Sequence, residues 1–288
     1  MKPAPFALSR PESVEQALQL IQQSPDAKFI AGGQSLLAMM NFRLARPEIL
    51  VDMSGLHELD RVFDEGDAIL FGAMTLHRTI ERSAVVRATI PMLADAATYI
   101  GHIAIRNQGT LGGTIAHSDP SAEIPATLLA LNATVFVERN GSARREVCIG
   151  DLFAGLYSTT LEYDEMITWV RVPKQSARCL WGFAEIAPRH GDFAEAGCAV
   201  LFSVDADQRM TGLRVSFLGL DDRPVIADGA DSLIGMELTY ENCLAMGYTL
   251  TGPLNPPDRQ EYRRHLGAVT FARACRQGLE RDRNIKRE

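Results

Sequence analysis

Two glycine-rich segments, about eighty residues apart, carry the pattern in this chain that is most typical of a binding site. One is Ala31-Gly32-Gly33-Gln34-Ser35-Leu36, and the other is Ile105-Arg106-Asn107-Gln108-Gly109-Thr110-Leu111-Gly112-Gly113-Thr114. Glycine costs conformational entropy, so a Gly-Gly pair is expected where bare backbone turns sharply or approaches another group closely. Consecutive backbone N–H groups can bind phosphate oxygens, with help where a helix begins. Two such segments facing each other would hold a diphosphate from both sides.

Neither glycine segment fits the common catalytic or nucleotide-binding motifs. Gly33-Gln34-Ser35 begins like a G-x-S-x-G nucleophile elbow, but Leu37 stands where the strained turn needs its last glycine. No Gly-Lys-Ser/Thr follows, as a P-loop requires, and neither segment reads G-x-G-x-x-G. A single Gly-Gly pair is more often a tight turn, but two of them, each after a strand-like run, favour a ligand site. No paired carboxylates and no His–Ser couple stand out, so no catalytic residue is predicted.

The composition excludes several classes of protein. The chain has 288 residues and a net charge of −7, which argues against a nucleic-acid binder. No apolar run is long enough to span a bilayer, and the first residues lack the apolar core of a secretory signal, so we expect a cytoplasmic protein. The five cysteines are widely spaced, whereas zinc and iron–sulfur sites use close pairs. We therefore expect free thiols and no metal site.

Hydrophobic periodicity predicts a chain that mixes helices and strands in three units. The first, residues 1–55, is expected to hold helices at 13–21, with Ser13 as N-cap, and 35–44, and strands at 28–31 and 48–53. The second, residues 56–176, is expected to hold a hairpin at 61–73, helices at 75–82, with Thr75 as its cap, 91–100 and from Pro125, a polar loop at 116–123, and strands at 133–138 and 166–173. The third, residues 177–288, is expected to hold antiparallel strands at 181–186, 196–204 and 213–218, then helices at 240–250 and 262–279.

Five ordered segments resemble the FAD-carrying medium subunit of the molybdenum hydroxylases, a family that includes carbon monoxide dehydrogenase and the flavin domain of xanthine dehydrogenase. They are the two glycine segments, Tyr157-Ser158-Thr159-Thr160-Leu161 ahead of Glu165, Arg189-His190-Gly191-Asp192-Phe193-Ala194, and the last helix with Tyr262-Arg263-Arg264. The resemblance covers nearly the whole chain. It implies an α+β fold of the vanillyl-alcohol-oxidase (PCMH-like) type, in which two α/β subdomains bind FAD. A C-terminal domain, with a three-stranded antiparallel sheet and helices, would cover the flavin.

The resemblance also implies which residues bind FAD. The backbone of the two glycine segments would hold the diphosphate, and Glu123 would bind the adenosine ribose unless it is only a charge at a helix start. Ile100 and Leu161 would pack on the rings, with core packing as the alternative, and Arg106 and His117 are expected to be structural. Thr114 departs from the acidic or amide residue that often follows the second Gly-Gly. The predicted cofactor-binding residues are Phe29, Ile30, Ala31, Gly32, Gly33, Gln34, Ser35, Leu36, Ile100, Thr110, Leu111, Gly112, Gly113, Thr114, Glu123, Leu161, Asp192 and Phe193.

The resemblance implies an electron-transfer role, in which the cofactor supplies the chemistry and the protein sets its geometry. Electrons would pass from two [2Fe–2S] clusters on a small subunit to FAD on this chain, and then to an external acceptor. A molybdopterin cofactor on a large subunit would hydroxylate the substrate, in a dimer of heterotrimers. Two alternatives remain at this point: a stand-alone FAD-dependent oxidoreductase on the same fold, and a scaffold without redox function.

Overall fold

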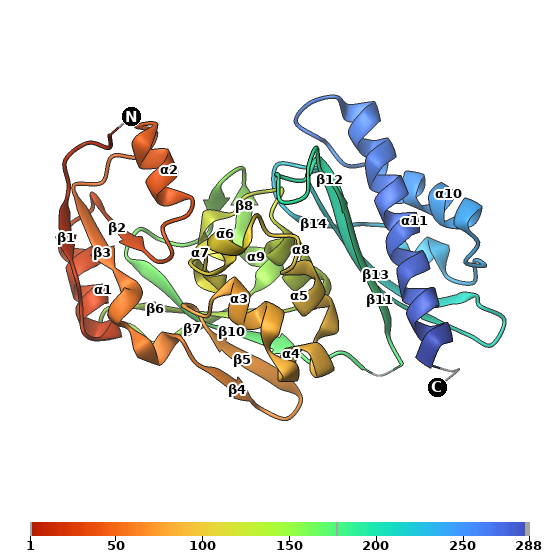
Figure 1. The fold of residues 1–288 in the computed structure, drawn as a ribbon, viewed down its shortest axis with the longest axis horizontal. Coiled ribbons are helices and arrows are strands. Elements are labelled where there is room, and N and C mark those ends of the chain that lie inside the picture. The colour runs from red at the N-terminus through yellow and green to blue at the C-terminus, as the bar shows by residue number, and fades with distance from the viewer. Residues whose placement is uncertain (1, 177, 286–288) are drawn as a thin grey trace.

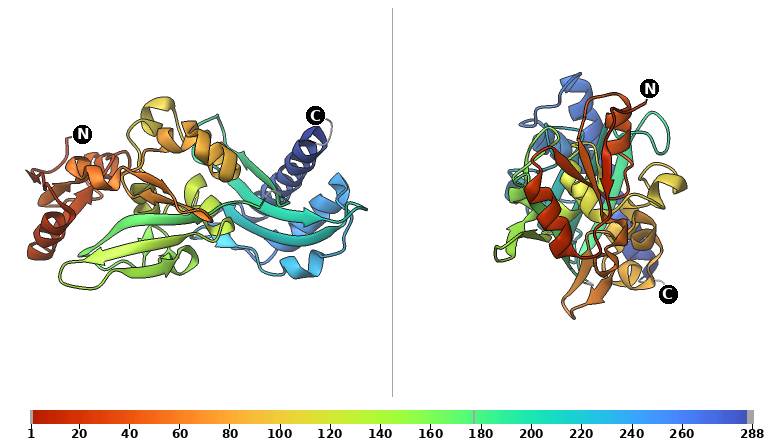
Figure 2. Two further views of the ribbon diagram at one scale, coloured as in Figure 1. Left: turned by 90° about the horizontal axis from the view of Figure 1, so that it is seen from below. Right: turned by 90° about the vertical axis from the view of Figure 1, so that its left-hand side faces the viewer.

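Three main β-sheets follow one another along the long axis of the molecule (Figure 1). The structure, a computed structural model, describes residues 2–176 and 178–285. The N-terminal sheet lies at one end, and the long C-terminal helix lies at the other (Figure 1). The left view of Figure 2 shows the same order along an elongated molecule, and the right view looks down the long axis.

The first sheet is parallel, in the order β1-β3-β2, with a helix on each face. Successive strand residues point to opposite faces. Val51 therefore packs with Leu18 of the first helix, whereas Leu50 packs with Met40 of the second. The elements are β1 (Ala7–Ser9), α1 (Val14–Gln23), β2 (Ala27–Ile30), α2 (Leu36–Asn41), β3 (Ile49–Asp52) and two short 3₁₀ helices, η1 (Met53–Gly55) and η2 (His57–Leu59).

Sequence patterns predicted most of this first unit. The N-cap at Ser13 is confirmed, because its side chain accepts a hydrogen bond from the Gln16 N–H at 3.1 Å. The helix predicted over 35–44 was too long: α2 ends at Asn41, and Arg43 turns the chain with a φ of 60°. Strand β1 was missed, because three residues are too few to show a period.

The second sheet is antiparallel, in the order β4-β5-β10-β6-β7. Its strands are β4 (Val62–Asp64), β5 (Ala68–Gly72), β6 (Thr134–Arg139), β7 (Arg145–Cys148) and β10 (Glu165–Pro173). Apolar residues such as Val170 pack with Leu111, Ile115 and Leu128 of the helices beside the sheet. The other elements are α3 (His77–Arg82), α4 (Ala84–Thr89), α5 (Pro91–Ala96), α6 (Ile103–Arg106), α7 (Leu111–His117), α8 (Glu123–Ala130), α9 (Ile149–Leu152), β8 (Phe153–Gly155) and β9 (Ser158–Thr159).

The hairpin and both long strands of this unit are confirmed, but several helix ends differ. Thr75 does not cap α3, which begins at His77; the Thr75 hydroxyl oxygen is buried without a partner among the described residues. Helix α5 ends at Ala96, well before position 100. Helix α8 begins at Glu123, two residues before the predicted Pro125, and α7 reaches His117 inside the predicted polar loop.

The third sheet is antiparallel, in the order β11-β12-β13-β14, and it separates two cores. On one face Phe183, Ala199 and Leu218 join the core of the second unit, and on the other Cys198 and Phe217 pack with the two C-terminal helices. The three predicted strands are confirmed and β14 is an addition. The elements are β11 (Leu180–Ile186), β12 (Ala196–Val204), β13 (Met210–Leu218), β14 (Val225–Ile226), η3 (Ala230–Leu233), α10 (Tyr240–Thr251) and α11 (Gln260–Ile285).

Replacing Gly182 with alanine should weaken the packing of α11 against β11. A Cβ atom at Gly182 would overlap the backbone carbonyl of Ala274, so helix and strand must move apart. We expect Gly182→Ala to lower the free energy of unfolding by about 2 kcal/mol, as overpacking usually does. Gly150→Ala is the control, because its Cβ would meet only a Leu129 methyl group at 3.7 Å. Equal chemical-denaturation midpoints for the two variants would contradict this packing.

Candidate functional site

The two glycine segments lie in direct backbone contact. A Cβ atom on Gly32 would overlap the carbonyl oxygen of Gln108 and lie 3.0 Å from the Cα of Gly109. A Cβ atom on Gly113 would lie 3.6 Å from that of Ala31. The close approach expected from the two Gly-Gly pairs is therefore present, and it joins the first sheet unit to the second.

The first glycine loop presents unpaired backbone donors. Gly33, with a φ of 70°, turns the chain as few residues other than glycine can. In the part of the chain that the structure describes, the N–H groups of Gly33, Gln34 and Ser35 donate to no other group. Ser35 stands before α2, and its hydroxyl makes no capping hydrogen bond. Successive free N–H groups of this kind form a concave site for an anion such as a phosphate.

The second glycine loop is anchored within the chain. The N–H groups of Leu111 and Gly112 donate to carbonyls of the connection between β5 and α3, at 2.9 and 2.8 Å. The N–H group of Gly113 donates to the Thr110 hydroxyl at 3.1 Å. That both loops bind a diphosphate through their amides therefore stays a prediction, and the hydrogen bonding favours the first loop as the main source of N–H donors.

Arg106 fixes the backbone at Ile100 and Gly101, shortly before the second glycine loop. Its guanidinium donates to the carbonyls of Ile100 and Gly101 at 2.9 and 3.1 Å, and to the carboxylate of Glu81 at 2.8 Å. The expectation that Arg106 is structural is confirmed by these contacts. They orient Ile100, which is half-buried against the core of the second unit.

The turn that carries Asp192 and Phe193 lies against the same corner. Gly191 has a φ of 87°, and a Cβ atom there would lie 2.9 Å from the carbonyl oxygen of Gly101. Asp192 and Phe193 are both exposed, and 79% of the phenylalanine surface is accessible. The structure thus brings this turn beside Ile100, while a contact between its side chains and a flavin ring stays a prediction.

The segment before Leu161 is fastened to the end of α7. The Ser118 hydroxyl donates to the carbonyl of Ser158 at 3.1 Å, and the Tyr157 hydroxyl is hydrogen-bonded to Asp119. Leu161 is half-buried and packs on the core of the second unit. The His117 ring lies 5.1 Å from the Tyr157 ring, and burial lowers the pKa of His117, as expected of a structural histidine.

Two carboxyl groups with raised pKa values, those of Glu123 and Glu185, lie where the second and third units join. Burial raises the pKa of Glu123, at the start of α8, to about 7, and the charge of Asp119 adds to this shift. Burial raises the pKa of Glu185, in β11, to about 8, and the charge of Glu123 adds to it. Sequence reasoning singled out Glu123 but missed Glu185. The only sign of Glu185 in the sequence was that this acidic residue alternates with the aromatic residues Trp181 and Phe183, on the same face of the strand.

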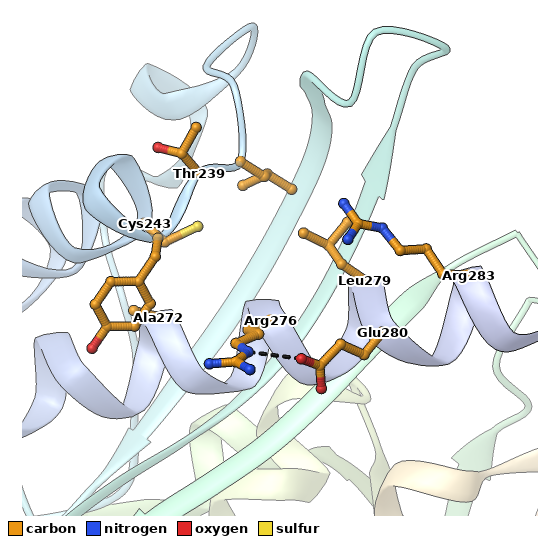
Figure 3. Close-up of a pocket in the computed structure, with 9 residues that line it drawn as sticks. Thr239, Cys243, Ala272, Arg276, Leu279, Glu280 and Arg283 are labelled. Carbon is orange, nitrogen blue, oxygen red and sulfur yellow. Dashed lines mark hydrogen bonds and ion pairs between the residues drawn. The ribbon is translucent and has the colours of Figure 1, made fainter.

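A separate cavity of about 350 Å³ lies between α10 and α11 (Figure 3). Cys243 and the ion pair between Arg276 and Glu280, 2.7 Å long, line it. None of its lining residues belongs to the two glycine loops, so it is distinct from the site described above. The described residues include no group of three side chains able to ligate a metal ion, and all five cysteines are free.

Comparison with known proteins accounts for this arrangement of loops. Residues 4–175 match the family model of the FAD binding domain in molybdopterin dehydrogenase. The chain belongs to this family. Residues 181–277 match a second model, the CO dehydrogenase flavoprotein C-terminal domain. Both matches agree with the resemblance noted in the sequence.

Relatives and solved structures support the same assignment along almost the whole chain. The nicotine 6-hydroxylase medium subunit of Paenarthrobacter nicotinovorans is 41% identical over 246 residues, which is 85% of this chain and 86% of that one. Caffeine dehydrogenase subunit beta of Pseudomonas sp. (strain CBB1) is 35% identical over 78% of this chain and 76% of its own length. In carbon monoxide dehydrogenase from Hydrogenophaga pseudoflava, one chain superposes with a TM-score of 0.92 at 33% identity, covering 98% of this chain and 99% of that one.

These matches confirm the predicted PCMH-like FAD-binding fold and identify the chain as an FAD-binding subunit of a molybdenum-hydroxylase-type oxidoreductase. They support the subunit interpretation over the stand-alone flavin enzyme, since relatives are named as medium subunits or chains. Among the described helices, none combines the length and the apolar character that crossing a bilayer requires.

Replacing Gly32 with alanine should disrupt the contact between the two loops. Since the new Cβ atom would overlap the Gln108 carbonyl, the loops must separate, and we expect FAD affinity to fall at least about tenfold. The measurement is the flavin absorbance retained per chain after gel filtration, with Ala38→Ser on the exposed side of α2 as the control. Full flavin occupancy in Gly32→Ala would count against the loop contact as part of the cofactor site.

The stability of the chain without cofactor should fall as pH rises from about 5 to about 9. Glu123 and Glu185 have pKa values of about 7 and about 8 in the folded chain, so the folded chain binds these protons more tightly than the unfolded one. Their stabilising effect is complete below the ordinary carboxyl pKa and is lost as pH rises through these raised values. We expect Glu185→Gln to flatten this decline in the thermal midpoint, and the exposed Glu146→Gln to leave it unchanged.

Proposed function

We propose that this chain is the FAD-carrying medium subunit of a three-subunit molybdenum hydroxylase. Its FAD would receive electrons from two [2Fe–2S] clusters on a small subunit and pass them to an external acceptor. One observation carries this proposal: two glycine loops in backbone contact, one with free N–H donors, in a chain of the FAD-binding family. FAD, when bound, supplies the electron-transfer chemistry.

The residues present fit the parts of FAD one by one. The free N–H groups of Gly33, Gln34 and Ser35 suit the diphosphate, because successive unbonded backbone donors can bind an anion. The turn at Gly191 lies against the carbonyl of Gly101, next to Ile100. Ile100 would offer an apolar side chain to the isoalloxazine, and the turn would offer the exposed side chains that follow Gly191.

Glu123 suits the ribose of the adenosine, because two hydroxyl groups can donate to one carboxylate. The other predicted contacts, from Phe29 to Leu36, from Thr110 to Thr114 and at Leu161, belong to the same proposal. The three-domain division at residues 55 and 176 belongs to it as well. The boundary between the two family matches, which end at 175 and begin at 181, supports the second of these divisions.

Partner subunits are part of the proposal. Relatives carry the names medium subunit and medium chain, which imply smaller and larger companions in those proteins. The described residues of this chain contain no cluster of metal-ligating side chains, so the iron–sulfur clusters and the molybdopterin would be carried by other chains. We further propose a dimer of heterotrimers and a cytoplasmic location, the latter supported by the five free thiols.

Purification of the native complex tests this function. We expect this chain to copurify with one smaller and one larger subunit, together with molybdenum, iron and FAD. After the subunits are separated under mild conditions, the visible flavin absorption should remain with this chain, while the metals remain with the others. A flavin-loaded chain that purifies alone from its native source and turns over a substrate unaided would overturn the proposal.

A further inference from the structure

Glu185 of β11 is half-buried, with its carboxyl oxygen Oε2 fully buried, and it has no role in the site predicted from the sequence. We propose that Glu185 is a cofactor-binding residue contributed by the C-terminal sheet, whose carboxylate accepts a hydrogen bond from a hydroxyl group of FAD opposite Glu123. This inference rests on the proposed function, because it assumes that FAD occupies the site beside the glycine loops. The C-terminal unit would then bind the cofactor through a polar side chain as well as cover it.

The strand places Glu185 on the correct face. Side chains of a strand alternate, so Phe183 and Glu185 point to one side of β11, and Gly182 and Ala184 point to the other. Gly182 faces α11, since a Cβ atom there would overlap its backbone. The ring of Phe183 lies 5.0 Å from that of Tyr99, the residue before Ile100. Glu185 therefore faces the corner where Ile100 approaches the second glycine loop.

One oxygen of Glu185 has no partner. Its Oε2 atom is buried and accepts no hydrogen bond from any residue that the structure describes. Burying a carboxylate oxygen without a donor is costly, so such atoms in native proteins call for a missing partner. The ribitol and ribose of FAD carry several hydroxyl groups, and each of these can donate to a carboxylate.

The surrounding groups explain why a hydroxyl ligand suits this position. Arg281 of α11 donates to the carboxylate of Asp95 at 3.2 Å and to the carbonyl of Trp181 at 3.0 Å. Its charge is therefore already engaged. The charged and titratable groups that face this space are Glu123 at the start of α8, Asp95 of α5, Tyr99, His190 beside Tyr99, and Arg281 of α11.

Cofactor binding should release a proton. Burial and the charge of Glu123 raise the pKa of Glu185 to about 8, so the group is largely protonated at neutral pH in the chain without FAD. A hydroxyl donor from FAD stabilises the carboxylate, lowers this pKa and sends the proton to solvent. FAD affinity should therefore increase as pH rises from about 6 to about 9.

The experiment titrates FAD into the full chain prepared without flavin and follows flavin fluorescence and binding heat in two buffers of different ionisation enthalpy. We expect the wild type to release protons on binding at about pH 7.5. Glu185→Gln should weaken binding at least about tenfold at about pH 8, since it lacks the ionised acceptor, and should remove most of the proton release and pH dependence. Glu146→Gln, an exposed carboxyl on β7, is the matched control.

The outcomes separate this inference from the proposed function. If the wild type binds FAD but releases no proton, or if Glu185→Gln binds FAD with unchanged affinity and pH dependence, Glu185 only shares a proton with Glu123 and the inference fails. The proposed function would still stand in that case. If the folded wild type binds no FAD at all, the proposed function itself fails. Circular dichroism and the thermal midpoint establish that Glu185→Gln is folded, and Glu185→Ala serves as a second variant.

Discussion

The contact between the main chain at Gly32 and the main chain at Gln108 and Gly109 is the constraint on which the rest of the site depends. No side chain fits at position 32, so the first sheet unit can approach the second this closely only with glycine there. The contact places the free N–H groups of Gly33 to Ser35 beside a loop whose own amides are already bonded. One loop is thus rigidly held, while the other keeps its donors available for an anion.

The stretch from Ile100 to Glu123 connects every part of the site. Its first residues are held by Arg106 and touch the turn at Gly191. Its middle contacts the first glycine loop, and Ser118 near its end is bonded to Ser158. A cofactor lying along this stretch would contact residues from all three sheet units.

The junction with the third sheet has a different physical character. There the chain buries two carboxyl groups close together, which is unfavourable when both are ionised. Because their pKa values are raised to about 7 and about 8, these groups keep protons that exposed carboxyls would lose. Under the role proposed for Glu185, hydroxyl groups of the cofactor would donate hydrogen bonds at this junction, whereas the glycine loops would bind the diphosphate.

The sequence alone was sufficient wherever the governing physics is local. The Ser13 cap, the hairpin around residue 66 and the alternation of β11 to β13 depend on neighbouring residues, and all were predicted correctly. Motif resemblance identified the family for the same reason, since short segments carry it. Tertiary structure decided the rest. Whether Thr75 caps a helix, where α2 stops, and which amides stay free depend on partners that lie far away in the sequence.

Glu185 shows this limit most clearly. In the sequence it is one acidic residue in an alternating strand, equally compatible with a solvent-facing position. Only the packing of β11 against the helices of the second unit brings its carboxyl group within range of the charge of Glu123. Burial and pairing are properties of the assembled sheets, and no local pattern encodes them.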